Sequence, residues 1–181
     1  MGRTWDAIPD HLAQWMPAQP VWFVASAPLS ASGHINLSPK GDDTFRVLDP
    51  HTVAYLDLTG SGAETIAHTR ENGRLTIMFC SFGEKPDIVR LYGIGEAVLA
   101  DHPDFAELVA HFPIKASTRS VIRLRIQEVT SSCGYGVPFM ELRGSRPMMD
   151  EWADRQGPKG IVEYRAKKNQ VSLDGLPALA E

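Results

Sequence analysis

The chain has 181 residues, 43 % of them hydrophobic, and a formal net charge of −4. A chain of this length buries about 70 % of its unfolded surface and fits a single domain. The acidic balance lacks the basic excess that supports binding to nucleic-acid phosphates, so we expect no nucleic-acid partner. The two cysteines, Cys80 and Cys133, show neither a disulfide framework nor zinc spacing, which favours a reducing compartment, and we expect the cytoplasm.

The N-terminus lacks a basic segment followed by an apolar one, so a secretory leader is not expected. The longest apolar runs, residues 21–25 and 75–80, fall far below the ~18 residues of a membrane span. We therefore expect no membrane association.

Six segments have the composition of β-strands. Residues 21–25 are β-branched and aromatic, and residues 33–38 alternate apolar and polar side chains after a turn, so the two segments predict a hairpin. Residues 119–130 show the period-two pattern of a half-buried antiparallel strand. The remaining three segments are residues 52–58, 74–81 and 87–100.

Helical patterns lie between and around these strands. Residues 10–16 predict a short helix that ends before Pro17, and residues 61–71 begin with a capping-box pattern from Ser61 to Glu64. Residues 101–112 carry an apolar stripe of helical period. Six strands with two interspersed helices do not alternate as in a parallel α/β fold, so we expect a mainly β or α+β class with an antiparallel barrel.

We expect one domain over residues 1–181. Residues 1–19 form an N-terminal arm in this interpretation, residues 20–132 the barrel, and residues 133–181 a C-terminal loop and helical tail. The tail is helical in composition over residues 150–156 and 161–169.

Several common kinds of active site are not indicated. The six histidines show no metal-ligand spacing, and neither a nucleophile elbow nor a phosphate-binding P-loop occurs, so no metal site is expected and no catalytic residue is named. Gly93 and Gly95 lie within a strand pattern, and no helix N-terminus follows them in the sequence. They predict a bulge or a close backbone approach instead of a dinucleotide-binding motif.

Two segments have the composition of an anion site. Residues 36–41 place an amide, a hydroxyl and the Lys40 ammonium at the end of a strand, where Lys40 can neutralise a phosphate. Residues 57–62 lead into a helix with two hydroxyls and two glycines, and free amides at a helix N-terminus attract anions. The alternative is a plain helix cap with a solvated surface lysine.

The order of several segments resembles the pyridoxamine 5′-phosphate oxidase-like family of FMN-binding split β-barrels. The resemblance spans residues 20–132, and the ordered set carries it because no single motif is specific. The matching segments are residues 21–25, 34–41, 52–57, 64–66, 71–74 and 88–93. Within the family, the chain looks like a branch that also carries residues 132–138 and the tail segment 173–177.

The resemblance implies a six-stranded antiparallel split β-barrel with flanking helices. It also implies a homodimer that holds two FMN molecules in grooves between the subunits. Lys40 matches a family lysine, residues 36–38 run beside the flavin, residues 55–57 occupy contact positions, and residues 59–62 adjoin the phosphate. The implied cofactor-binding residues are Asn36, Leu37, Ser38, Lys40, Tyr55, Leu56, Asp57, Thr59, Gly60, Ser61 and Gly62.

The chain departs from the oxidases proper at three places. Ser61 and Gly62 stand where those enzymes have an Arg-Lys pair, and Ile88 stands where they have a glutamine. The phosphate must then rely on hydroxyls, backbone amides and Lys40. The substrate-binding arginine and histidine of the oxidases have no clear counterpart, which argues against oxidation of pyridoxamine phosphate itself.

Arg90, Cys133 and Tyr135 complete the candidate site. Arg90 shares a strand face with apolar residues, where a guanidinium needs a partner, either the flavin or a carboxylate at the barrel end. Cys133 and Tyr135 follow the last strand beside two glycines. They either line the isoalloxazine pocket, from their own or the partner subunit, or belong to a structural turn.

The expected function is that of an FMN-binding oxidoreductase in which the flavin carries out redox chemistry on an unidentified small molecule. The alternative is a non-catalytic protein that binds flavin, F420 or haem on the same barrel. His34 and Cys133 are poor candidates for an axial haem ligand because each stands alone. A third alternative leaves the groove empty.

Overall fold

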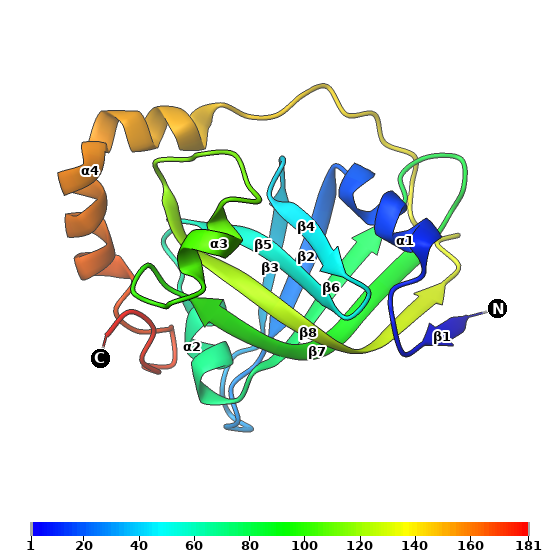
Figure 1. Ribbon diagram of the computed structural model, residues 1–181, viewed down its shortest axis with the longest axis horizontal. Helices are drawn as coiled ribbons and strands as arrows, with labels where there is room; N and C mark the ends of the chain where they lie inside the picture. The colour runs from blue at the N-terminus through cyan, green and yellow to red at the C-terminus, as the bar shows by residue number, and fades with distance from the viewer. Residues whose placement is uncertain (1, 181) are drawn as a thin grey trace.

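A curled antiparallel sheet forms the centre of the computed structural model, which describes residues 2–180 (Figure 1). Residues 1 and 181, the outer ends of the predicted arm and tail, lie outside the described residues. The sheet order is β3-β2-β6-β7-β8-β5-β4, and β1 also pairs with β8. The strands are β1 Arg3–Trp5, β2 Val21–Ser26, β3 Asn36–Gly41, β4 Phe45–Asp49, β5 Thr52–Leu58, β6 Arg74–Cys80, β7 Ile88–Val98 and β8 Thr118–Ser132.

Four helices surround the sheet. Helix α1 (Asp10–Trp15) and the 3₁₀ turn Met16–Ala18 lie near one end of the barrel, and α2 (Glu64–Glu71) lies at the other (Figure 1). Helix α3 (Phe105–Val109) precedes β8. Helix α4 (Met148–Lys168) is bent at Gly157, where φ is 64°, so its two halves agree with the two helical segments expected in the tail. No helix within residues 2–180 has the length and apolar character needed to cross a membrane.

The core fills the concave side of the sheet. Its centre is an aromatic cluster in which Trp22 contacts Tyr55, Phe45 and Phe79, with ring centroids 5.0–5.9 Å from that of Trp22. These side chains are at most 3 % exposed. Because buried aromatic side chains remove large apolar areas from water, this cluster holds β2, β4, β5 and β6 together.

The expected antiparallel split barrel with flanking helices is confirmed, but the expected number of six strands is too low. The prediction missed β4 because its five residues lie between Asp43 and Pro50, and the flanking aspartates and proline give the region the composition of a loop. It also missed β1, whose three residues are too few for a recognisable period. The arm at residues 1–19 therefore contributes a strand to the sheet, paired through Thr4 and Thr130.

The start of α2 also differs from the prediction. The helix begins at Glu64, with Ala63 at the N-cap position and no side-chain cap, so the expected capping box does not form. The Glu64 carboxylate instead accepts the backbone N–H of Leu173 at 3.2 Å. The tail therefore lies against the N-terminus of α2, as Figure 1 also shows.

The predicted bulge in the long strand is confirmed. The register between β7 and β8 shifts between Tyr92 and Gly93. A Cβ atom on Gly93 would overlap the Arg125 carbonyl oxygen. The strand thus needs glycine here because another backbone passes too closely for a side chain.

We predict that Gly93→Ala destabilises the protein by about 1–3 kcal/mol, because β8 must move to admit the methyl group. Urea denaturation measures the change. Gly83→Ala is the control, since a Cβ there meets no atom within 4 Å. Equal stabilities for the two variants would contradict the close approach of β7 and β8.

Candidate functional site

Lys40, Tyr55 and Asp57 meet where the barrel is open. Strand β3 lies at one end of the sheet order, and β5 lies beside the strand at the other end. The Lys40 Nζ atom is nevertheless 3.7 Å from Asp57 Oδ1 and 5.7 Å from the centre of the Tyr55 ring. The sheet therefore curls until its two ends face each other. Three residues that the sequence assigned to the cofactor site lie together there.

Asp57 is a fully buried counter-charge. Its carboxylate accepts hydrogen bonds from Arg119 Nε at 2.8 Å, Arg119 Nη2 at 3.2 Å and Ser120 Oγ at 3.0 Å. Burial alone would raise the pKa of this carboxyl, but the charges of Arg119 and Lys40 and these hydrogen bonds outweigh it, and the pKa is lowered. Asp57 therefore neutralises cations and holds Arg119 in place.

The turn at residues 59–62 connects β5 to α2 and is held by polar contacts on several sides. Both Thr59 N and Thr59 Oγ1 donate to the Ser117 carbonyl at 2.8 Å. Arg119 Nη1 donates to Gly62 O at 2.8 Å. The tail adds Arg165, whose Nε donates to Thr59 Oγ1 at 2.9 Å, and Asn169. Ser61 and Gly62 are exposed.

The sequence prediction missed three residues of this region, namely Arg119, Arg165 and Asn169. Arg119 lies in the predicted strand at 119–130, where the alternating pattern indicates a strand and gives no sign of a site. The contacts of Arg165 and Asn169 with the turn span more than 100 positions of sequence. The one signal in the sequence is the group of basic residues at the end of α4, Arg165, Lys167 and Lys168.

Asn36 and Ser38 belong to a separate polar network along β3. Asn36 Nδ2 donates to Ser26 Oγ and Thr65 Oγ1, both at 3.1 Å, and Ser38 Oγ donates to Asn36 Oδ1 at 2.8 Å. Ser26 Oγ also lies 2.9 Å from His68 Nδ1. Burial lowers the pKa of His68, which favours the neutral ring. The network connects β3 to α2.

The other predicted site residues lie apart from Lys40. Leu56 is buried in the core beside Val98, whereas Leu37 lies on the outer face of the sheet and is 65 % exposed. Arg90 donates to Ser132 Oγ at 3.2 Å and has no carboxylate partner within residues 2–180, so the ion pair that was the alternative to a flavin contact is not present there. Cys133 and Tyr135 are exposed on the loop after β8.

A cavity of about 860 Å³ opens beside Lys40. Its lining combines the end of β3, the segment 17–21, Leu58 and the start of α4. Residues 137–147, here called the strap, cross the top of the molecule from β8 to α4 (Figure 1), and Leu142 and Arg146 from the strap also line the cavity. Lys40 therefore belongs both to the buried charge cluster and to the wall of this cavity.

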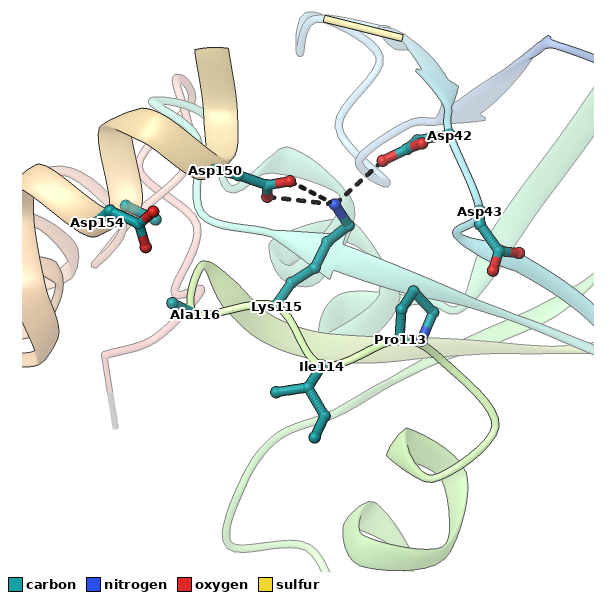
Figure 2. A pocket seen from close by; sticks show the side chains of 9 residues that line it. Asp42, Asp43, Pro113, Ile114, Lys115, Ala116, Asp150 and Asp154 are labelled. Carbon is teal, nitrogen blue, oxygen red and sulfur yellow. Dashed lines mark hydrogen bonds and ion pairs between the residues drawn. The ribbon is translucent and has the colours of Figure 1, made fainter. Parts of the chain in front are cut away.

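An ion cluster fixes the start of α4 beside this cavity. Figure 2 shows Lys115 between two carboxylates, with Nζ 3.1 Å from Asp42 Oδ2 and 2.8 Å from Asp150 Oδ2. The hydrogen bond to Asp150 is the main reason that the pKa of Lys115 is raised. Ser145 Oγ donates to Asp42 Oδ1 at 3.2 Å and connects the strap to the same cluster.

Comparisons with known proteins agree with this fold. The family model described as "Pyridoxamine 5'-phosphate oxidase" matches residues 8–133. The protein ustO of Aspergillus flavus, named as a pyridoxamine 5'-phosphate oxidase family protein, is 42 % identical over 192 residues, covering 97 % of this chain and 77 % of ustO. The chain belongs to the pyridoxamine 5′-phosphate oxidase family.

Solved structures show the same fold at lower sequence identity. HupZ of Group A Streptococcus is 20 % identical with a TM-score of 0.52, covering 67 % of this chain and 91 % of HupZ. A protein of Mesorhizobium loti described as FAD-binding is 17 % identical with a TM-score of 0.50, covering 72 % of this chain and 96 % of that one. At these identities, the likeness establishes only the split barrel.

We predict that Asp57→Asn destabilises the protein by about 3–5 kcal/mol at neutral pH, because Arg119 and Lys40 lose their buried counter-charge. The lowered pKa of Asp57 contributes stability above the unfolded-state pKa, and this contribution is lost as the pH falls through the folded-state pKa. The difference between wild type and variant should therefore shrink in acid.

Urea denaturation at about pH 7 and about pH 3 measures both effects, provided that the wild type is still folded at the lower pH. Asp101→Asn is the matched control, because Asp101 is exposed and makes no ion pair within residues 2–180. A stability difference that stays constant with pH would contradict the charge pairing of Asp57.

Proposed function

We propose that the protein is an FMN-dependent oxidoreductase that binds the flavin phosphate at the Lys40 end of the open barrel. The observation that carries the proposal is an imbalance of charge: Lys40 and Arg119 share the buried carboxylate of Asp57, and Arg165 lies nearby with no carboxylate partner within residues 2–180. A phosphate group would balance the remaining positive charge. Membership of the pyridoxamine 5′-phosphate oxidase family supports the choice of a flavin.

The donor groups present fit a phosphate. The backbone amides of Gly60, Ser61 and Gly62 have no acceptor within residues 2–180, and Ser61 and Gly62 are exposed. Lys40 is partly exposed, and its Nζ atom lies 3.7 Å from Asp57 Oδ1. Amides near a helix start and an ammonium group are a common combination at phosphate sites. Bound FMN would supply the redox chemistry, and these residues would bind and orient it.

The cavity beside Lys40 suits a small organic molecule. Its volume of about 860 Å³ lies within the usual range of ligand pockets, about 300–1,000 Å³. Its lining within residues 2–180 contains no histidine or cysteine. Haem would find neither of these common axial ligands there, which favours flavin over haem as the bound group.

We further propose that the protein is a homodimer joined through the outer face of the sheet. Register places Pro39, Phe23, Met78 and Arg90 in one row across β3, β2, β6 and β7. The neighbouring row ends at Tyr92 and includes the exposed Leu37. A broad apolar sheet face of this kind is typical of an interface between identical subunits.

We predict a solution mass of twice 19.9 kDa by light scattering. Ile94→Glu places a charge on the outer face and should shift the mass toward that of the monomer. Ile114→Glu is the control, because Ile114 is fully exposed on the loop before β8. A monomeric wild-type protein would overturn the dimer proposal.

We also predict that the protein binds FMN and that Lys40→Ala weakens binding at least about tenfold, since a charge-assisted contact to the phosphate contributes about 1.5–3 kcal/mol. Flavin absorption and fluorescence titration of the flavin-free protein measure the dissociation constant. Lys85→Ala, at an exposed loop position, should bind like the wild type. A wild-type protein that binds no FMN contradicts the proposed function, and an unchanged affinity in Lys40→Ala removes Lys40 from the site.

A further inference from the structure

The hydrogen-bond acceptors of the 59–62 turn are occupied by side chains of the protein. Arg119 binds the carbonyl of Gly62, and Asn169 Nδ2 lies 2.9 Å from the carbonyl of Gly60 and 3.5 Å from that of Ser61. The Thr59 hydroxyl accepts from Arg165 and donates to the Ser117 carbonyl. In each of these contacts, a donor of the protein occupies an oxygen atom that would otherwise repel a phosphate.

The hydrogen-bond donors of the same turn are left free. With its carbonyls turned toward Arg119 and Asn169, the turn keeps the amides of Gly60, Ser61 and Gly62 without an acceptor in residues 2–180. The Ser61 hydroxyl is exposed. The amides of this turn and the Ser61 hydroxyl are therefore available to bind an anion, and the Glu64 carboxylate that lies against Gly62 is held by the Leu173 N–H.

The tail supplies two of the three side chains that occupy the acceptors of this turn. Asn169 is fully buried, and its Oδ1 atom has no hydrogen-bond donor in residues 2–180. A buried acceptor without a donor costs free energy, and a hydroxyl of a bound molecule would remove this cost. The half-buried Arg165 has only oxygen partners without charge, the Thr59 hydroxyl and the carbonyls of Ser117 and Thr118.

We propose that Arg165 and Asn169 are positioning residues for the flavin phosphate, and that they compensate for the Ser-Gly pair at positions 61 and 62. This inference rests on the proposed function. Arg165 adds positive charge behind Thr59, and Asn169 holds the carbonyls of the turn away from the phosphate. The C-terminal tail therefore completes the binding site. It supplies one cation, Arg165, and one hydrogen-bond donor, Asn169, that the barrel does not provide.

The comparison of FMN with riboflavin tests the proposal, because riboflavin has the same ring and ribityl chain and lacks the phosphate. We expect Arg165→Met and Asn169→Leu to lower the ratio of FMN affinity to riboflavin affinity at least about tenfold, while riboflavin affinity stays near that of the wild type. Arg165→Lys keeps the positive charge, so its preference for FMN over riboflavin should be closer to that of the wild type than the preference of Arg165→Met. Lys168→Met on the same helix is the control, because this substitution also removes one positive charge and Lys168 is exposed.

The outcomes separate the two proposals. If the wild type prefers FMN over riboflavin and the variants keep that preference, the positioning role is overturned and the proposed function stands. If affinity for both flavins falls equally, the tail has only a structural role and the inference is also overturned. If the wild type binds neither flavin, the proposed function itself fails. Thermal denaturation identifies any variant that does not fold, and the remaining variant then decides the result.

Discussion

The arrangement of the site depends on one buried carboxylate. Asp57 contacts Arg119 and Ser120 on β8 and Lys40 on β3, so a single side chain connects the middle of the sheet to its far edge. Without this negative charge, a guanidinium and an ammonium would stand close together in a poorly solvated place. The position of Lys40 and, through Arg119, the orientation of the adjoining turn depend on this interaction.

Most strands of the barrel can be predicted from the sequence, because their residues form apolar runs or alternate between apolar and polar side chains. Strands β2, β5, β6, β7 and β8 lie in strand-length apolar or alternating segments bounded by turn residues, and all five were expected close to their observed positions. Strand β4 was not expected, because it has only five residues and lies between Asp43 and Pro50. The turn residues on both sides give this edge strand the composition of a loop.

The candidate site is less predictable because its contacts are distant in sequence. The resemblance to a known family pointed to Lys40 and Asp57 as two flavin contacts, and it gave no sign that they pair with each other. Arg119, Arg165 and Asn169 reach the same turn from positions far along the chain, through side-chain contacts with backbone oxygens. Such contacts leave no periodic signal, since carbonyl groups occur at every residue.

The strap has a consequence for the integrity of the chain. Its residues are largely exposed, and its contacts with the rest of the molecule are few, among them Met140 N to Phe82 O and Ser145 to Asp42. Helix α4 and the tail are anchored independently, through Lys115, Arg165 and Asn169. A protease would find the strap the easiest place to cut, yet the severed C-terminal piece would stay bound by these contacts. We therefore expect the two fragments to stay associated after cleavage of the strap, because their mutual contacts do not pass through it.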